Sequence, residues 1–239
     1  MFSLPRAVQC ALLVSAFFGS AHAGAAEPSA SFKAACESKL PRSSIVVTSE
    51  PSEVTYIFNR GVQDLTKRSP AYAKSSTQTT LGLTESKFQL ESRWSGEMLQ
   101  DPRSRLACTR PAIQVTVKVG PQVVSIGREF EREGCAFWEI AEHELRHVRA
   151  NLERVEYVAE KLEQELRSSF GNRVFYGSSD ELRNAFSSTL KAEWLPWGKS
   201  LYEGVKVAHQ AIDSPEEYAR SSTMCDGEVG KALAMHRAR

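Results

Sequence analysis

The feature that most constrains the fold is an unbroken stretch over residues 136–168, which contains neither proline nor glycine. Glutamate, lysine, arginine, leucine and alanine dominate this stretch, and these residues favour the α-helix. The sequence therefore predicts one long helix over these residues. We expect it to end at Phe170-Gly171-Asn172, because glycine and asparagine commonly follow the last turn of a helix.

The first half of the chain carries strand patterns. Hydrophobic and polar residues alternate over residues 113–119, which predicts a half-buried strand. Gly120-Pro121 is expected to turn the chain into a returning strand over residues 122–126, so that the two strands form a hairpin. Other β-branched and aromatic runs predict strands at 45–48, 54–58, 77–84 and 87–94. A turn before residue 63 is expected to lead into a short helix at 63–67.

Three more helices are predicted after the long one. Ser178 and Glu181 have the spacing of a capping box, and the helix that they begin is expected to reach Trp194. The next is expected over roughly residues 199–212, and the last begins with Pro215 in its first turn. Because strands come first and helices after, the sequence predicts an α+β fold.

The N-terminus has the pattern of an export signal. Arg6 precedes an apolar run, and Ala21-His22-Ala23 has the small-x-small form of a cleavage site. We therefore expect residues 1–23 to be a signal peptide and the mature chain to be periplasmic or secreted, with no membrane span. Residues 24–44 are predicted to be a loose leader, and residues 45–239 a single α+β, zincin-like domain.

Acidic and basic residues are balanced in the mature chain. The full sequence has 30 Lys and Arg against 29 Asp and Glu, and the signal contains one basic residue and no acidic one. The mature net charge is therefore zero with histidine neutral. Such a balance gives no reason to expect nucleic acid as a partner.

Four of the five cysteines remain after removal of the signal, namely Cys36, Cys108, Cys135 and Cys225. An even number in an exported chain predicts two disulfides, with three possible pairings. Cys108 and Cys135 bracket the expected hairpin, and Cys36 and Cys225 lie near the two mature ends, so we expect these two pairs. Zinc held by cysteines is disfavoured, because no two of them have the CxxC spacing.

The long helix carries His143-Glu144-Leu145-Arg146-His147, an HExxH motif. Residues four apart lie one turn apart on the same face of a helix, so both imidazoles can reach one metal ion. In zinc hydrolases with this motif the histidines are ligands and the glutamate takes a proton from the zinc-bound water. The motif therefore predicts Zn²⁺ bound by His143 and His147, Glu144 as catalytic base, and a peptide or protein substrate.

A catalytic zinc site needs a third protein ligand, and the sequence leaves its identity open. One familiar position lies six residues after His147, where this chain has Glu153, but Ala150 stands where a glycine would bend the helix. Glu163 and Glu165 lie further along with no helix breaker before them. The C-terminal helices offer His209, Asp213 and Glu217. His209 could equally be a helix histidine without a metal, and the two acids could serve the start of the last helix.

With these residues in view, the chain resembles the bacterial family of predicted secreted zinc-dependent proteases. Proteins of this family have a signal peptide, a mostly β first half and HExxH on a long helix. The resemblance covers residues 108–166, through Gly134-Cys135-Ala136-Phe137 and residues 142–148, and extends to residues 213–218 and Cys225.

The resemblance implies that His143 and His147 are ligands and that Glu144 is the general base. It implies neither a third ligand nor a substrate. The alternative hypothesis is a non-catalytic exported protein of the cell envelope that binds a metal or another protein. In that case the helix is structural, and its two histidines fall one turn apart by chance.

Overall fold

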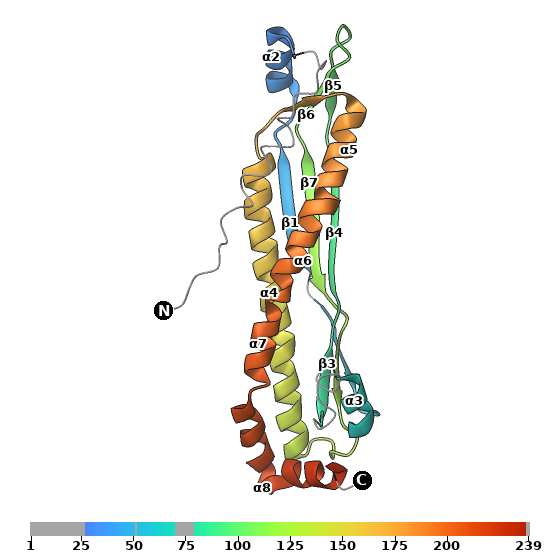
Figure 1. Cartoon of the computed structure of the whole chain (residues 1–239), viewed down its shortest axis with the longest axis vertical. Coiled ribbons are helices and arrows are strands. Elements are labelled where there is room, and N and C mark those ends of the chain that lie inside the picture. Colours follow the sequence, from blue (N-terminus) through green and yellow to red (C-terminus); the bar gives the residue numbers. More distant parts are fainter. Residues whose placement is uncertain (1–26, 51, 70–78, 238–239) are drawn as a thin grey trace, which may run out of the picture. The chain divides into compact units, whose positions relative to one another are not determined.

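The computed structural model describes residues 27–50, 52–69 and 79–237 (Figure 1). Its helices and strands confirm the predicted α+β fold. The chain divides into two compact units. The first comprises Met1–Val46, Ser92–Gln114 and Leu162–Glu193, and the second comprises Val47–Glu91, Val115–Lys161 and Trp194–Arg239. The predicted signal peptide, residues 1–23, lies outside the described residues.

The first unit contains a three-stranded antiparallel sheet in the order β5-β6-β9. Its elements are α2 (Ala30–Lys39), β5 (Met98–Gln100), β6 (Ala107–Thr109), β9 (Phe175–Gly177) and α5 (Ser179–Thr189). The capping box predicted for Ser178 and Glu181 is confirmed at the start of α5. A π-helical segment, Leu190–Trp194, follows α5.

Helix α2 lies in the segment that was expected to be a loose leader. The hydroxyl of Ser29 accepts a hydrogen bond from the Phe32 amide and so caps its first turn. Phe32 and Cys36, one turn apart, are its buried residues, and they pack in a cluster with Leu40 and Cys108. The segment is ordered as a helix because this apolar face and a cysteine have partners in the sheet.

The second unit contains a sheet in the order β2-β8-β3. The central strand β8 (Gln122–Ile126) pairs parallel with β2 (Val54–Ile57) and antiparallel with β3 (Gly82–Glu85). Helix α3 (Val62–Arg68) confirms the short helix predicted near residues 63–67. Strand β3 covers part of the strand expected over residues 77–84, of which residues 77 and 78 lie outside the described residues.

Four long elements contribute residues to both units. Strands β1 (Ser44–Glu50), β7 (Ala112–Val119) and β4 (Phe88–Ser95) form a third sheet in the order β1-β7-β4. Helix α4 (Cys135–Phe170) confirms the long helix that the absence of proline and glycine predicts. Its residues 135–161 belong to the second unit.

The hairpin expected over residues 113–126 is not formed. Strands β7 and β8 are the centre strands of two different sheets, so the chain runs on from one sheet to the next instead of reversing. Between them the backbone N–H of Gly120 donates to Lys87 and that of Gln122 donates to Glu53. Both donors are thus satisfied by neighbouring segments, and the two strands do not need each other as partners.

The expected disulfide pairing is also wrong. The structure pairs Cys36 with Cys108 and Cys135 with Cys225. The expectation rested on the hairpin, and without it Cys108 and Cys135 belong to different units. The observed bonds tie α2 to β6 in the first unit and the start of α4 to the last helix in the second.

The C-terminal segment forms three helices: α6 (Leu195–Glu203), α7 (Val205–Ile212) and α8 (Pro215–Arg237). One helix was expected over residues 199–212, but it breaks at Gly204. Arg154 of α4 donates from Nε to the Leu201 carbonyl at 2.7 Å, the acceptor that a continuing helix would use for Val205. A Cβ atom at Gly204 would collide with the Arg154 guanidinium, so a larger residue here would displace that side chain from the Leu201 carbonyl.

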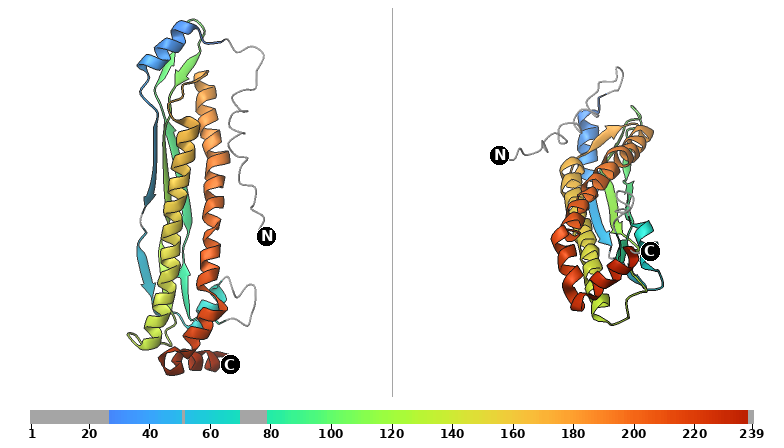
Figure 2. Two further views of the ribbon diagram at one scale, coloured as in Figure 1. Left: turned by 90° about the vertical axis from the view of Figure 1, so that its left-hand side faces the viewer. Right: turned by 60° about the horizontal axis from the view of Figure 1, so that its bottom comes forward.

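Helix α8 is bent. Residues Met224–Gly227 have non-helical backbone angles, with positive φ at Cys225, Asp226 and Gly227, and both views in Figure 2 show the chain changing direction there. Cys225 therefore faces Cys135 at the bend. Val229 packs with Phe137 and Ile140 of α4 in the core of the second unit.

Two disulfides fit a protein that folds outside the cytoplasm. Within the part of the chain that the structure describes, no helix combines the length and apolarity that crossing a bilayer requires.

Peptide mapping of the oxidised protein is expected to recover Cys36 linked to Cys108 and Cys135 linked to Cys225. The first bond closes a separation of 72 residues, so a Cys36→Ser, Cys108→Ser double variant should lose about 2–5 kcal/mol of unfolding free energy in a denaturant titration. A peptide that links Cys108 to Cys135 would contradict the structure.

Candidate metal centre

Three potential metal-binding atoms meet in the second unit. His143 Nε2 lies 3.1 Å from Asp213 Oδ1, and His147 Nε2 lies 3.2 Å from the same oxygen. The two Nε2 atoms are 3.3 Å apart. Among the described residues, His143, His147 and Asp213 are the His, Cys, Asp or Glu side chains that lie close enough together to hold one metal ion.

Local structure explains why these side chains meet. The two histidines lie one turn apart on α4, as the motif predicts. Asp213 ends α7, and its backbone leaves the helical conformation there. The start of α8 is capped by Ser214, whose hydroxyl accepts from the Glu217 amide at 3.2 Å. The Asp213 carboxylate is therefore not needed as a cap and is available to face the two histidines.

The spacing of the three atoms fits a zinc ion. Zinc in proteins is tetrahedral, with nitrogen and oxygen ligands at about 2.0–2.2 Å, so two ligand atoms of one ion lie about 3.3–3.5 Å apart. The observed separations of 3.1, 3.2 and 3.3 Å come within 0.2 Å of that range. Two imidazoles and one carboxylate are also a donor set that zinc accepts, and they leave a fourth position open.

Electrostatics at the cluster favour a cation. Burial raises the pKa of Asp213, but hydrogen bonds to His143 and His147 outweigh it and hold the pKa below its usual value. Burial lowers the pKa of His143, yet the hydrogen bond to Asp213 and the nearby Glu144 raise it overall. The carboxylate thus stays ionised and attracts positive charge to the point where the three atoms meet.

Glu144 lies beside this cluster and is 5% exposed. Thr84 of β3 donates from its hydroxyl to Glu144 Oε2 at 2.7 Å, which fixes the carboxylate. Burial raises the pKa of Glu144 above its usual value, against the opposing effect of the two histidines. Gly82 permits this approach, because a Cβ there would lie 2.7 Å from both Glu144 Oε1 and Ile140 Cγ2.

Glu217 does not join the metal-binding atoms. Its carboxylate pairs with Arg146 of α4 and with Arg220 of α8. Hydrogen bonds from Arg220 and Arg146 lower its pKa to about 2. Arg220 also pairs with Glu139 at 3.2 Å, so these four side chains connect α8 to α4 next to Asp213.

His143 contacts this ion-pair network through its other ring nitrogen. Nδ1 lies 3.1 Å from Arg146 Nη2 and 3.6 Å from Glu217 Oε1. The Arg146 guanidinium only donates, so Nδ1 is an acceptor in this contact, and 3.6 Å to Glu217 Oε1 is too long for a hydrogen bond. A metal at Nε2 would place the proton of a neutral imidazole on Nδ1, so Arg146 would then have to move away from this nitrogen.

The other candidates for the third ligand lie elsewhere. Glu153 is exposed, and Glu163 pairs with Arg167 on the surface of α4. His209 is close to His147, but it contacts the nitrogen that faces away from Asp213, with 2.9 Å between the two Nδ1 atoms. Burial and the neighbouring His147 lower the pKa of His209.

Sequence reasoning missed several side chains around the cluster. Thr84 and Gly82 act on Glu144 from an adjacent strand. Asn151 contacts His209, and Tyr202 donates to Asn151. No sequence pattern marks these residues, because their partners at the site come from other elements and meet them only in the folded chain.

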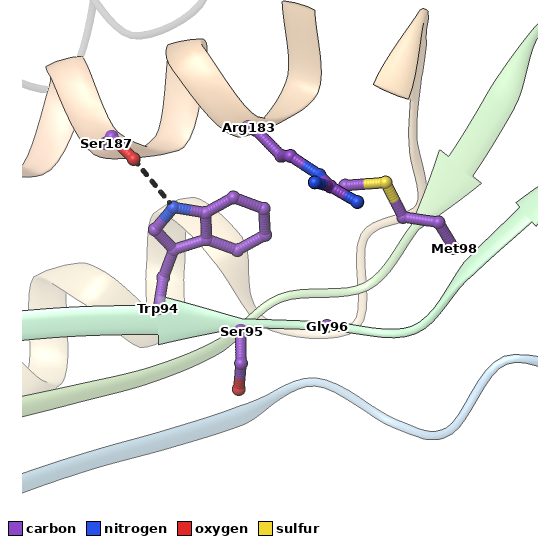
Figure 3. A pocket seen from close by; sticks show the side chains of 6 residues that line it. All are labelled: Trp94, Ser95, Gly96, Met98, Arg183 and Ser187. Carbon is purple, nitrogen blue, oxygen red and sulfur yellow. Dashed lines mark hydrogen bonds between the residues drawn. The ribbon is translucent and has the colours of Figure 1, made fainter. Parts of the chain in front are cut away.

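Two surface hollows are lined by residues other than those of this cluster. The first hollow, of about 390 Å³, lies in the first unit and is lined by Trp94, Met98 and Arg183 among others (Figure 3). At this hollow, Trp94 Nε1 donates to Ser187 Oγ at 3.0 Å. Another of about 520 Å³ in the second unit is lined by Tyr56, Phe58 and Arg132 with their neighbours. Neither includes a carboxylate, histidine or cysteine.

Comparison of the chain with protein-family models, with curated proteins and with solved structures found no match. The metal centre therefore has to be judged from its own geometry and charge.

Replacing Asp213 by alanine is expected to weaken zinc binding by at least about 100-fold, more than the loss of an outer-shell partner costs. Affinity is measured by competition with a chromophoric chelator, and stoichiometry by metal analysis. The matched control is Glu216→Ala, which removes an exposed carboxylate three residues away. Equal affinities of the Asp213→Ala variant and the unmodified protein would exclude Asp213 as a ligand.

Proposed function

We propose that this protein is an exported zinc-dependent metallopeptidase. The observation that carries the proposal is the triangle formed by His143 Nε2, His147 Nε2 and Asp213 Oδ1, with its sides of 3.1–3.3 Å, beside the buried carboxylate of Glu144. Two nitrogens and one oxygen at this spacing, next to a held carboxylate, are the parts of a hydrolytic zinc site.

His143, His147 and Asp213 would hold the ion. When bound in such a site, zinc lowers the pKa of a coordinated water and polarises the carbonyl of a peptide bond. The carboxylate of Asp213 would offset part of the ion's charge, and the imidazoles would hold it on the rigid face of α4. The third ligand that the sequence left open is thus assigned to Asp213.

Glu144 would serve as the general base. A base works best when its pKa lies near the working pH, and burial raises the pKa of Glu144 in that direction. The Thr84 hydroxyl holds Oε2, and Oε1 accepts no hydrogen bond from the residues that the structure describes. Glu144 can therefore accept a proton on Oε1 from the attacking water and pass it to the leaving amine.

The proposal extends to location and family. A cleaved signal over residues 1–23 would place the protein in the periplasm or outside the cell, and the two disulfides support export. We also propose kinship with the bacterial secreted zinc-dependent proteases that the sequence resembles, on the basis of the HExxH helix and residues 213–218. The proposed partner is a peptide or protein substrate.

A Glu144→Gln variant tests the reaction. It removes the base but keeps the size of the side chain, so kcat/KM on a library of quenched fluorescent peptides is expected to fall by about 10²- to 10⁴-fold. Zinc content should be unchanged, because Glu144 is not among the ligands. Glu142→Gln, an exposed change on the same helix, is expected to leave cleavage intact.

Equal cleavage by the Glu144→Gln variant and the unmodified protein would overturn the assigned role. If the zinc-loaded protein binds the metal at one equivalent but cleaves neither the peptide library nor unfolded casein, the non-catalytic metal-binding alternative is correct.

A further inference from the structure

His147 is contacted at both ring nitrogens. Its Nε2 faces His143 and Asp213, as described above, while its Nδ1 lies 2.9 Å from Nδ1 of His209 on α7. Two facing nitrogens at this distance share one proton, so one imidazole must donate and the other must accept. The direction of this hydrogen bond decides whether His147 presents a lone pair or an N–H to the metal site.

Asn151 contacts the second ring nitrogen of His209, Nε2. It lies one turn after His147 on α4 and is 2% exposed. Its Oδ1 lies 3.1 Å from His209 Nε2 and accepts from the Tyr202 hydroxyl at 2.9 Å. Its Nδ2 donates to Gln122 Oε1 at 3.0 Å and to Ser86 Oγ at 3.2 Å. Both ends of the amide are therefore fully engaged.

With the Asn151 oxygen facing His209, that oxygen only accepts, so His209 carries its proton on Nε2. In neutral His209 the lone pair is then on Nδ1, where it can accept from His147 Nδ1–H. The Asp213 oxygen, 3.2 Å from His147 Nε2, also only accepts, so these contacts alone do not place a lone pair on Nε2. A metal ion bound at Nε2 requires that lone pair, and the proton of a neutral His147 is then on Nδ1, facing His209.

We propose that His209, held by Asn151, is a positioning residue that keeps the proton of His147 on Nδ1 and so presents the Nε2 lone pair to the metal. This role rests on the proposed function, because a bound ion is what requires a lone pair on Nε2 and therefore a proton on Nδ1. A histidine ligand commonly has its second nitrogen bonded to an outer group that fixes its tautomer and orientation. Here a second histidine supplies that group.

The network is built on rigid parts of the second unit. Gln122 lies on the central strand β8 and is completely buried. The Tyr202 ring stacks on Phe88 with a centroid distance of 4.1 Å. Each partner of Asn151 is thus fixed by packing, which keeps the amide in one orientation and makes its effect on His209 specific.

A second arrangement of protons satisfies the same contacts and also gives the Asp213 oxygen a donor. If the amides of Asn151 and Gln122 were both reversed, Asn151 would donate to His209 Nε2, His209 would donate to His147, and His147 would carry its proton on Nε2. That proton would point at Asp213 and block ligation. The two arrangements therefore make opposite predictions for which ring nitrogen of His209 carries the proton in the zinc-loaded protein.

The test uses the full mature chain labelled with ¹⁵N. Long-range proton–nitrogen spectra distinguish the two imidazole tautomers, and scalar coupling across the hydrogen bond connects the two Nδ1 atoms. The expected result for the zinc-loaded protein is a proton covalently bound to His147 Nδ1 and coupled to His209 Nδ1. A proton covalently bound to His209 Nδ1, or no coupling between the two Nδ1 atoms, would overturn the proposal.

Variants test the consequence for metal affinity. His209→Leu removes the acceptor and is expected to weaken zinc binding by about 10- to 100-fold. His209→Gln restores an acceptor oxygen and should recover most of that loss, which a purely structural role of the imidazole would not predict. Gln210→Leu, an exposed change on the same helix, is the control and should bind zinc as the unmodified protein does.

The two proposals fail in different ways. If the unmodified protein binds no zinc, the proposed function and the role of His209 are both wrong. If it binds zinc but His209→Leu, with an unchanged fold by circular dichroism, binds it equally well, the role of His209 alone is wrong.

Discussion

The carboxylate of Asp213, which lies within hydrogen-bond distance of both HExxH imidazoles, is the contact on which the arrangement of the second unit's site depends. It comes from the junction of α7 and α8, so those helices must be held against α4 for the cluster to exist. The ion pairs of Glu217 with Arg146 and Arg220, and the disulfide between Cys135 and Cys225, supply that attachment on the same side. The Asp213 side chain is 41% exposed, so part of its carboxylate stays in water, and for the remainder the compensating groups are two imidazoles whose spacing suits a metal ion.

Two buried polar side chains at this contact are each held by a residue from another element. Glu144 is fixed from β3 by Thr84, and His147 is fixed from α7 by His209. The first positions a proton acceptor next to the cluster, and the second would orient a ligand. Both partners reach α4 from separate elements, so the helix presents the motif while strand β3 and helix α7 determine what its side chains can do.

The sequence predicted the parts of this structure that depend on local pattern. The α+β class, the long helix, the capping box at Ser178 and the pair of histidines on one helix face all follow from residue type and spacing. It failed where pairing is non-local: β7 and β8 do not form a hairpin, and the disulfides inferred from that hairpin were wrong. Asp213 was one of several candidates for the third ligand. The residues Ser214-Pro215-Glu216-Glu217 correctly predict the cap of α8, but nothing in a linear sequence shows which C-terminal side chain packs against the two histidines. Asn151, Tyr202 and Thr84 could not be found, since only the packing of strands and helices brings them to the site.

The most direct test of the metal centre is a crystal structure of the zinc-soaked mature protein with data collected on both sides of the zinc absorption edge. An anomalous difference peak is expected about 2.0–2.2 Å from each of His143 Nε2, His147 Nε2 and Asp213 Oδ1. A fully occupied peak at another position, or no peak among these three atoms at saturating zinc, would contradict the assignment of this cluster as a zinc site.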